Sequence, residues 1–566
     1  MQCHSGPFHR HQCRRLWLPA LAVLLLLTIT LPAAAVDLLE ERLRHRLEVA
    51  SEHGVGLVDG ALAAPGPRLT RFYEERVFAP AWVDADGAVP LGRALVAAIE
   101  NAEDDGMEPA DYPLPTLRRM LAVAEAGSAG TELLIDLEFL LTGTYLVFAS
   151  HALAGRVDPE TVDPAWHIER RRDDAVVTSL ESALQSGRVA ETLRELFPDN
   201  GRYRQLRKAL ARYRAIDADS GFTRIDAGPA LRPGDRSERV MALRERLRQS
   251  RDLPAEAAMV DDAGYYDTQL EDAVRAFQRR HGLEVDSIVG PRTLEAMNVS
   301  AEDRVRQILV NLERWRWLPG DLGARHLLVN IAAFELELVM DDRVVDTQRV
   351  IVGRDYRQTP VFAGRMTYLV FNPSWEVPTS IAVRDVLPQV RRDPEYLERM
   401  GFQVLRGWGA AQQEIDPARI DWQSVSARGF PYRFRQRPGP LNALGQVKFM
   451  FPNQYAVYLH DTPARELFDR AERAFSSGCI RVESPLRLAR LVLDDDRWDD
   501  AAIGRVLIDG RERTVSLARP VPVYLQYMTA WADENGTVHL RRDLYDRDTR
   551  VADALREGPP DLTALY

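Results

Sequence analysis

The sequence contains little cysteine and almost no lysine. Only three of its 566 residues are cysteine, and only Lys208 and Lys448 of its 73 basic residues are lysine. The 84 acidic residues outnumber the basic ones and give a formal net charge of −11. Nucleic-acid-binding domains carry a basic stripe or patch, so this acidic chain gives no reason to expect a nucleic-acid partner.

The first 35 residues have the three-part pattern of an export signal. Three arginines at positions 10, 14 and 15 precede an apolar run from Leu16 to Leu31, and Pro-Ala-Ala-Ala at 32–35 is a small-residue cleavage pattern. The alternative is an uncleaved anchor, since an apolar run of 16 residues is short for a membrane span but close to one. Both interpretations put the rest of the chain outside the cytoplasm, and the second implies association with the inner membrane.

Loss of the signal would leave a single thiol, that of Cys479, because Cys3 and Cys13 lie within the signal. One cysteine cannot form an internal disulfide, so in an exported protein it is a free reactive thiol or a link to another chain. No cysteine follows the apolar run where a lipid would be attached, which argues against lipidation.

Residues 37–226 have the apolar spacing of helices. Apolar residues recur every three or four positions in 91–109 and again in 197–216. Residues 132–155 are apolar almost all round, but two acidic side chains interrupt them. That pattern is typical of a buried helix, so we expect a helical domain here and no membrane span.

A linker rich in Gly, Asp and Pro at 226–233 leads into a compact unit at 231–298. Two amphipathic helices are readable in it, Gly282 ends the second, and a third short helix begins after Gly290. The apolar faces of the first two are Val240, Leu243 and Leu247, and Leu270, Val274 and Phe277. Three short helices make a binding module with a small core, and a spacer is the simpler alternative.

The periodicity changes after residue 319. Residues 304–319 form one more amphipathic helix, and the segments that follow alternate with the period of two that is typical of strands. We expect strands at 327–331, 335–340, 343–353, 366–372, 446–451 and 455–460. A long irregular insert at about 380–440 separates the two groups, and such inserts are often lids. Asn535-Gly536 predicts a hairpin near the C-terminus.

Cys479 lies in SSGCIRVE, 19 residues after His460 in LHDTP. A cysteine nucleophile reacts as the thiolate, and histidine is the side chain best suited to accept its proton near pH 7. The histidine in turn needs an acceptor on its other ring nitrogen. Small residues before the cysteine let backbone N–H groups approach a developing oxyanion. The pattern therefore predicts a nucleophile and base in Cys479 and His460.

The simpler interpretation of Cys479 is a buried small hydrophobic residue. Export, the absence of a partner cysteine and polar, glycine-containing neighbours argue against it. A zinc site is disfavoured, because one cysteine and one histidine have no further ligands at a recognisable spacing. We therefore expect no metal and no organic cofactor.

LHDTP followed by SSGCIRVE resembles the signature of the YkuD-type L,D-transpeptidase catalytic domain, whose usual form is HGT followed by SHGC[IV]R. AVRAFQRRHGLEVD and VGPRTL, within 231–298, resemble the peptidoglycan-binding domain. Other stretches are similar to the large murein L,D-transpeptidases with a helical N-terminal scaffold: RFYEERVFAPAW (71–82), NLERWRWLP (311–319), FNPSWEVP (371–378) and RQRPGPLNALGQVKF (435–449). The resemblance spans nearly the whole chain after the signal, in the same order.

The resemblance implies a multidomain α+β fold in the cell envelope, or periplasm, of a Gram-negative bacterium. It implies a helical scaffold at 37–226, a three-helix peptidoglycan-binding module at 231–298, a mostly-β catalytic domain at 304–515 with a capping insert at about 380–440, and a C-terminal hairpin and tail at 516–566, after a signal or anchor at 1–35. Its partners would be the stem peptides and the glycan of peptidoglycan.

The resemblance also implies a role for each residue that matches the motif. Cys479 matches the nucleophile and His460 the base, which the backbone carbonyl of Asp461 would orient. The backbone N–H groups of Gly478 and Cys479 would line the oxyanion hole.

Three further residues of the motif are expected to contact substrate. Tyr458, two residues before the base, should point the same way as the base, and Arg481 and Ser477 flank the nucleophile. A structural salt bridge or hydrogen bond to the loop is the alternative for Arg481. The chain departs from the family pattern at Ser477, which replaces a histidine, at Asp461, which replaces a glycine, and at Ser287, where the binding module commonly has glycine.

The implied reaction is a transpeptidation that links two stem peptides 3→3 through a thioester on Cys479, and carbapenem-type β-lactams should acylate the same thiol. An L,D-carboxypeptidase would pass the same acyl group to water, and a lipoprotein-attaching enzyme would pass it to a lysine. A non-catalytic peptidoglycan-binding protein is the alternative from another class, and the intact pair of Cys479 and His460 argues against it.

Overall fold

The computed structural model describes residues 32–53, 56–57, 62–63, 67–83, 89–169, 174–254 and 262–558. The chain divides into two compact units. Unit 1 comprises residues up to Val96 and Pro113–Tyr145, and unit 2 comprises Ala97–Tyr112 and the chain from Leu146 onward. The expected helical scaffold at 37–226 is therefore shared between the units, and residues 1–31 of the expected signal lie outside the described residues.

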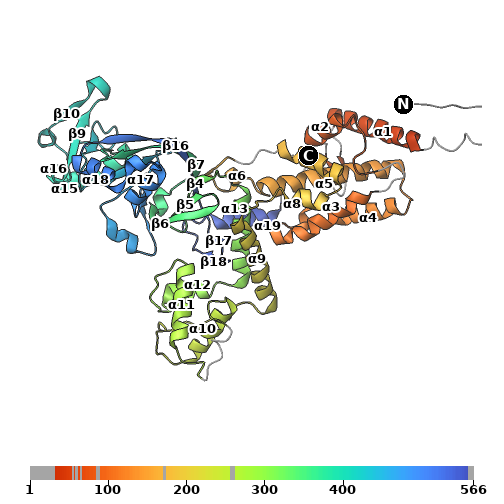
Figure 1. Ribbon diagram of the computed structural model, residues 1–566, viewed down its shortest axis with the longest axis horizontal. Coiled ribbons are helices and arrows are strands. Elements are labelled where there is room, and N and C mark those ends of the chain that lie inside the picture. Colours follow the sequence, from red (N-terminus) through yellow and green to blue (C-terminus); the bar gives the residue numbers. More distant parts are fainter. Residues whose placement is uncertain are drawn as a thin grey trace, which may run out of the picture. The chain divides into compact units, whose positions relative to one another are not determined.

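Unit 1 is mainly helical (Figure 1). It contains α1 (Pro32–His53), β1 (Gly56–Leu57), β2 (Leu62–Ala63), α2 (Pro67–Glu75), α4 (Leu114–Glu125) and the first parts of α3 (Pro90–Glu100) and α5 (Thr131–Ala154). The two acids that interrupt α5 both have partners. Asp136 lies 2.6 Å from the guanidinium of Arg46, and the buried Glu138 accepts hydrogen bonds from the backbone N–H groups of residues 81–83.

Helix α5 is the one helix in the described part of the chain that is long and apolar enough to cross a membrane. However, 78% of its most apolar stretch is buried inside the protein. That burial is what a core helix requires.

Unit 2 contains further helices besides those of its binding module and its sheet. They are α6 (Pro159–Val162), α7 (Asp174–Ser186), α8 (Val189–Arg194), α9 (Gly201–Asp219), α13 (Ala301–Arg316) and α19 (Asp548–Glu557). Helix α13 packs against both α9 and α19. Its side chains Ile308, Leu312 and Trp315 are buried, and the Ser300 side chain caps its first turn by accepting a hydrogen bond from Asp303 N.

The expected three-helix module is present as α10 (Glu238–Gln249), α11 (Thr268–Arg280) and α12 (Pro291–Met297). Every apolar residue that we expected on the inner faces of the first two helices is fully buried in the core of the module. Gly282 follows α11 in the left-handed conformation (φ +66°), which ends the helix as the sequence predicts.

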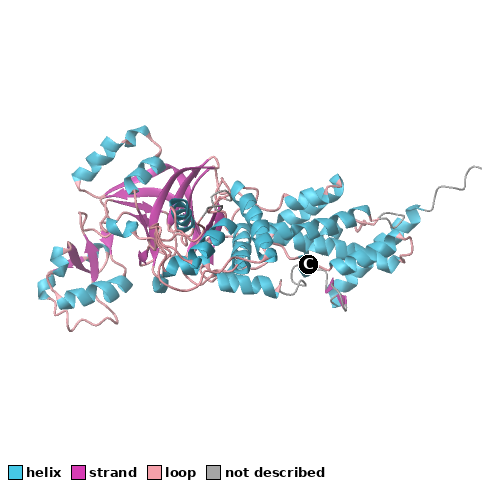
Figure 2. Cartoon of the chain, turned by 90° about the horizontal axis from the view of Figure 1, so that it is seen from below, coloured by secondary structure: helices cyan, strands magenta, loops and turns pink. Residues whose placement is uncertain are grey.

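A large mixed sheet forms the rest of unit 2, and Figure 2 shows its curved strands. Its strands are β3 (Trp166–His167), β4 (Arg325–Asn330), β5 (Glu335–Met340), β6 (Arg343–Gly353), β7 (Val361–Phe371), β12 (Val447–Met450), β13 (Leu459–His460), β14 (Ala474–Ser476), β15 (Ile480–Val482) and β16 (Arg513–Gln526). The order is β12-β13-β15-β6-β5-β4-β16-β7-β3, and β12 also pairs with β7, which closes the path on itself. Helix α17 (Pro485–Leu493) packs against β12 and β16, and α18 (Asp500–Asp509) follows it.

Strand β16 crosses the expected domain boundary between residues 515 and 516. It pairs in parallel with β4 and antiparallel with β7, with a register shift between Ser516 and Val521. Pro520 and Pro522 lie inside it, and because proline is rare within strands the segment does not read as one. Residues 516–526 are therefore part of the sheet, and only β17 (Ala530–Ala532), β18 (Val538–Leu540) and α19 follow it.

The insert is a small folded subdomain. Its strands β8 (Trp375–Glu376), β9 (Phe402–Arg406), β10 (Gln413–Ile415) and β11 (Arg433–Gln436) form a sheet in the order β10-β9-β11-β8. With them lie α14 (Thr379–Ile381), a π-helical turn (Ala382–Val386), α15 (Leu387–Arg392) and α16 (Tyr396–Arg399), around a hydrophobic core of their own. The sequence suggested an irregular segment because β8 and β11, which pair with each other, are more than 50 residues apart.

Candidate active site

Three adjacent strands bring the expected site residues to one face of the sheet. Strand β13 places His460 opposite Arg481 of β15 and opposite Lys448 of β12. Side chains alternate along a strand, and the pairing continues one residue further, since Ile480 N donates to the carbonyl of Tyr458. Tyr458 and Cys479 therefore share the face of His460, and the rings of Tyr458 and His460 lie 5.7 Å apart.

The imidazole of His460 is buried and held from one side. Its Nδ1 lies 2.5 Å from the carbonyl oxygen of Asp461, which can only accept, so the proton is on Nδ1 and Nε2 is the basic nitrogen. Burial, and then the positive charges of Arg481 and Lys448, lower the pKa of His460 to about 3. The ring is therefore neutral at pH 7 and able to accept a proton.

The side chain of Asp461 fixes the loop that carries this carbonyl. It accepts hydrogen bonds from two backbone N–H groups, at 2.8 and 2.6 Å, and from the guanidinium of Arg465 at 2.6 Å. Gly445 makes room for it, since a Cβ there would lie 2.3 Å from the carboxyl group. An aspartate where the family motif has glycine thus holds the acceptor that orients His460.

Cys479 is a free, partly exposed cysteine. The protein atoms packed around its thiol raise the pKa, against the opposing effects of Tyr458, Lys448 and Arg481. The thiol donates to a backbone carbonyl 3.7 Å away. With a neutral His460, the resting site holds a thiol and a neutral imidazole on one face of the sheet, and not a thiolate–imidazolium ion pair.

Arg481 carries an unpaired charge at this site. Its Nε is buried without a hydrogen-bond partner, and no ion pair in the described part of the chain includes its guanidinium. Burial, and then the charge of Arg354, lower its pKa, while the proximity of Cys479 raises it. A half-buried cation without an ion-pair partner is suited to hold an anionic group.

The loop at 477–479, which we call the nucleophile loop after the expected role of Cys479, is fixed by Ser476. Its hydroxyl donates to the carbonyl of Cys479 at 2.5 Å and accepts from the N–H of Gly478 at 3.0 Å. The N–H of Gly478, which we expected to face an oxyanion, is thus engaged within the loop. Gly478 has φ +116°, a conformation that favours glycine.

The side chain of Ser477 takes no part in the hydrogen bonds that Ser476 makes with the loop backbone. Its hydroxyl accepts a hydrogen bond from Nη1 of Arg357 at 2.7 Å, and the same nitrogen lies 2.6 Å from Asp385 in the insert. The residue that replaces the histidine of the family motif therefore joins the loop to the insert through an arginine.

The large sheet carries a recognisable domain. Residues 324–514 match the family model of the L,D-transpeptidase catalytic domain. These residues are an L,D-transpeptidase catalytic domain. Residues 67–210 match the scaffold domain, and residues 236–297 match the model named "Putative peptidoglycan binding domain".

One curated protein supports this assignment. A curated Haemophilus influenzae protein named "Putative L,D-transpeptidase" is 37% identical over 253 residues, which are 44% of this chain and 50% of that protein. The chain thus spans about half the length of this curated relative. A solved L,D-transpeptidase structure from Xylanimonas cellulosilytica is 17% identical and covers 53% of this chain and 99% of its own, but its TM-score of 0.17 is too low for a comparison of folds.

Two residues of the catalytic-domain site were not predicted from the sequence. The ammonium group of Lys448 lies 3.9 Å from the centre of the Tyr458 ring, and burial lowers its pKa. Trp375, in β8 of the insert, lies close enough to Tyr458 to oppose the rise that burial causes in its pKa. The rarity of lysine is a signal that could have pointed to Lys448, because one of only two lysines lies at the centre of the site.

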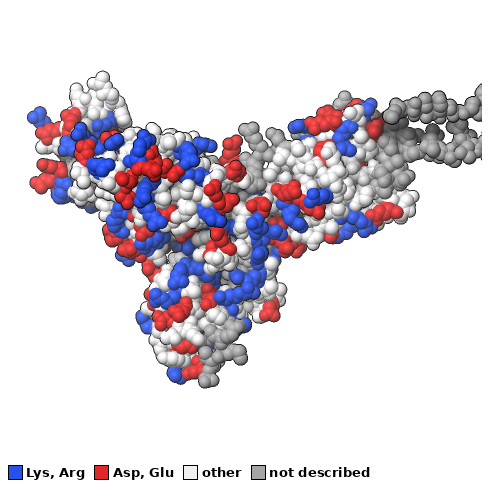
Figure 3. Space-filling model, viewed as in Figure 1, with Lys and Arg blue, Asp and Glu red and all other residues white. Residues whose placement is uncertain are grey.

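The positive charge at the candidate site is local. On the face shown in Figure 3, basic and acidic side chains are interspersed and no broad field of one sign covers the described residues. Within those residues, no three His, Cys, Asp or Glu side chains are grouped so that they could hold a metal ion. The groups that are present, a thiol, a neutral imidazole and two cations, suit acyl transfer through a thioester.

Proposed function

We propose that the protein is a peptidoglycan L,D-transpeptidase that forms 3→3 cross-links through a thioester on Cys479. The observation that supports this most is the arrangement of His460, neutral and oriented by the carbonyl of Asp461, on the same face of the sheet as Cys479.

The first step makes the acyl-enzyme. The sulfur of Cys479 attacks the carbonyl carbon of the third residue of a tetrapeptide stem while Nε2 of His460 takes the thiol proton. The C–N bond to the terminal D-alanine then breaks, and its amine leaves with the proton that His460 returns. A neutral pair at rest favours this transfer during the attack, because His460 is free to accept.

The second step transfers the acyl group. The side-chain amine of a neighbouring stem attacks the thioester carbonyl, the C–S bond breaks, and His460 passes the amine proton to the sulfur. The thiol is regenerated and one amide bond has replaced another. Coverage by the insert, whose Trp375 reaches Tyr458, would keep water from competing as acceptor.

Arg481 is the proposed anchor for a carboxylate of the stem peptide. Its buried Nε without a hydrogen-bond partner supports this role over the structural salt bridge. For the oxyanion we propose the N–H of Cys479, which no described backbone hydrogen bond uses, in preference to that of Gly478, which donates to Ser476.

The remaining parts have proposed roles that follow from the matched models. Residues 231–298 would bind the glycan, the helical scaffold would lie at 37–226 and the catalytic domain at 304–515. Enzymes that act on peptidoglycan work in the cell envelope, so we place the protein in the periplasm, exported through residues 1–35.

The test is incubation of the full chain with disaccharide-tetrapeptide, with products followed by mass spectrometry and Cys479→Ala as the control. Cross-linked dimers that have lost one D-alanine support the proposal. Tripeptide monomers alone would indicate an L,D-carboxypeptidase, and transfer to a lipoprotein lysine would need that acceptor. Full activity in Cys479→Ala would refute the assignment of the nucleophile, and acylation by a carbapenem should add one adduct on Cys479.

A further inference from the structure

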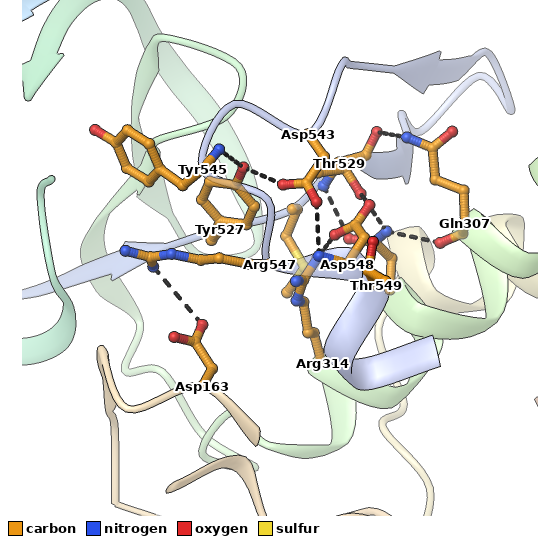
Figure 4. A network of polar contacts seen from close by, with 12 residues as sticks. Asp163, Gln307, Arg314, Tyr527, Thr529, Asp543, Tyr545, Arg547, Asp548 and Thr549 are labelled. Atoms are coloured by element: carbon orange, nitrogen blue, oxygen red, sulfur yellow. Dashed lines mark hydrogen bonds and ion pairs between the residues drawn. The ribbon is translucent and has the colours of Figure 1, made fainter. Parts of the chain in front are cut away.

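The C-terminal residues that follow the sheet form a buried polar network with the rest of unit 2 (Figure 4). The hydroxyl of Tyr527 donates to Asp543 at 2.5 Å and accepts from the backbone N–H of Tyr545 at 2.8 Å. Asp548 accepts from Arg314 of helix α13 at 2.5 Å and from a threonine hydroxyl at 2.6 Å. A segment expected to be a hairpin and tail is thus tied into the interior of the protein.

Two side chains of this network reach Thr359, in the loop between β6 and β7. The hydroxyl of Tyr545 accepts from Thr359 N at 3.4 Å and donates to the carbonyl of Gly353 at 2.6 Å. Nη2 of Arg547 donates to the carbonyl of Thr359 at 3.3 Å and to Gln358 at 3.0 Å. Both backbone groups of Thr359 are therefore held by the C-terminal segment.

The side chain of Thr359 in turn holds the nucleophile loop. Its hydroxyl donates to the carbonyl oxygen of Gly478 at 2.9 Å and accepts from Gly353 N at 2.9 Å. Thr359 is fully buried, so no water replaces these bonds. Gly353 is needed for this contact, because a Cβ there would lie 2.8 Å from Thr359 N.

The bond to the Gly478 carbonyl also fixes the orientation of the peptide plane between Gly478 and Cys479. The carbonyl of Gly478 and the N–H of Cys479 belong to one planar peptide and point in opposite directions when that peptide is trans. A hydroxyl that holds the oxygen on one side therefore sets the direction of the N–H on the other side. Gly478 has the backbone freedom to turn this peptide, with φ +116° and no atom closer than 3.7 Å to the position that a Cβ would take, so the plane needs an external hold.

We propose that Thr359, Tyr545 and Arg547 are positioning residues that aim the N–H of Cys479 at the oxyanion of the acyl-transfer step. The proposal rests on the proposed function in one respect, that Cys479 is acylated. The C-terminal segment then serves catalysis through Thr359 without contacting substrate.

The test compares two reactions of the same thiol in the full chain. Iodoacetamide alkylates the sulfur, with a C–S bond formed and iodide released, and no oxyanion develops. p-Nitrophenyl acetate acylates it, with a thioester formed and p-nitrophenolate released through an oxyanion. Misdirection of one oxyanion donor should lower the acylation rate about 10- to 100-fold and leave the alkylation rate and its pH profile unchanged.

Thr359→Val removes the hydroxyl at nearly constant volume, and Thr359→Ser retains it. We expect the selective loss of acylation in Thr359→Val and its rescue in Thr359→Ser. Tyr545→Phe should show a smaller loss of the same kind. Tyr112→Phe is the matched control, because it also removes one buried phenol hydrogen bond, to His151 at 2.9 Å, far in sequence from this loop.

Equal ratios of acylation to alkylation in wild type, Thr359→Val and Tyr545→Phe would overturn the proposal. So would a wild type that is alkylated but not acylated by the ester. If Thr359→Val does not fold, Tyr545→Phe and Thr359→Ser still decide the matter. A wild type that reacts with the ester yet does not turn over stem peptides would refute the proposed function and leave this inference standing.

Discussion

At the scale of single residues, the resting charges of the site lie on Lys448 and Arg481, and the two reacting groups are neutral. Burial removes the proton from His460 and keeps the proton on Cys479, in the directions that desolvation requires for a base and an acid. The cations beside them favour a negative sulfur, so the thiolate is stabilised when it forms. At rest the site therefore contains no thiolate–imidazolium pair, but its two cations stabilise the negative charge of the thiolate when it forms.

This arrangement predicts the pH dependence of thiol alkylation. Because the pKa of Cys479 is raised, the thiolate fraction should increase steadily as the pH rises from about 6 to 9, with no plateau near neutrality. Because the pKa of His460 is about 3, no inflection should occur near pH 6.5. Iodoacetamide rates across this range measure both effects. A plateau below pH 7 would indicate a preformed thiolate–imidazolium pair.

Lys448 provides the sharpest single-residue test of the local field. Lys448→Met removes a buried positive charge beside the thiol, so the alkylation profile should move to higher pH by about one unit, which corresponds to about 1.4 kcal/mol. Lys208→Met is the matched control, since Lys208 is the other lysine and lies exposed on α9. Equal profiles for the two variants would show that Lys448 does not act on Cys479.

At the scale of elements, the turn after α11 shows how the binding module tolerates a serine where glycine is common. Ser287 has φ +65°, a strained conformation for a residue with a Cβ. Its N–H donates to Gln278, its carbonyl accepts from Tyr266, and its hydroxyl binds Glu271 and Arg275. Hydrogen bonds to all three groups hold the strained residue in place.

Two substitutions at Ser287 separate strain from hydrogen bonding. Ser287→Ala keeps the strain and loses the hydroxyl, so α11 should open more easily by about 1–2 kcal/mol. Ser287→Gly loses the hydroxyl but relieves about 1 kcal/mol or more of strain, so its effect should be smaller. Hydrogen exchange of the α11 amides in the full chain measures both. Greater opening in Ser287→Gly than in Ser287→Ala would contradict this account.

Local pattern explains which elements could be predicted. Strands β5 and β6 have the expected bounds because alternation marks them and Asp341 and Asp342 turn between them with φ of +47° and +60°. The strand expected at 455–460 is only the two-residue β13, since Ala456 has φ +54° and interrupts the extended chain. The strand at 516–526 was not predicted because Pro520 and Pro522 lie within it and proline is rare in strands.

Contacts between distant segments explain what the sequence did not predict. Cys479 and His460 are detectable because each lies in a short motif, whereas the bonds that join Thr359 to Gly478 and to Tyr545 span more than 100 residues. A hydrogen bond between such distant segments cannot be predicted from a local sequence pattern. The roles of Lys448 and Trp375 likewise depend on strand register, which a single sequence does not determine.

At the scale of the whole molecule, the insert and the nucleophile loop are joined through one side chain. Arg357 donates to Asp385 of the insert at 2.6 Å and to Ser477 of the loop at 2.7 Å. Asp385 lies in a π-helical turn, a feature that is frequent at functional sites. The ion pair is partly exposed, so it contributes about 1 kcal/mol or less. A contact of that strength can hold a cover in place and still allow it to open.

Loss of this contact should change the partition of the acyl-enzyme between amine and water. Asp385→Asn removes the charge that Arg357 binds, so the insert should open more often, and the ratio of tripeptide monomers to cross-linked dimers should rise about two- to five-fold, the range set by a loss of up to about 1 kcal/mol. Mass spectrometry of the products measures this ratio. Asp393→Asn is the matched control, because Asp393 pairs with Arg399 inside the same insert. Asp385 binds Arg357, which also binds Ser477, whereas Asp393 does not take part in this contact. If both variants changed the ratio equally, or if neither did, opening of the insert would be excluded as the cause of the change.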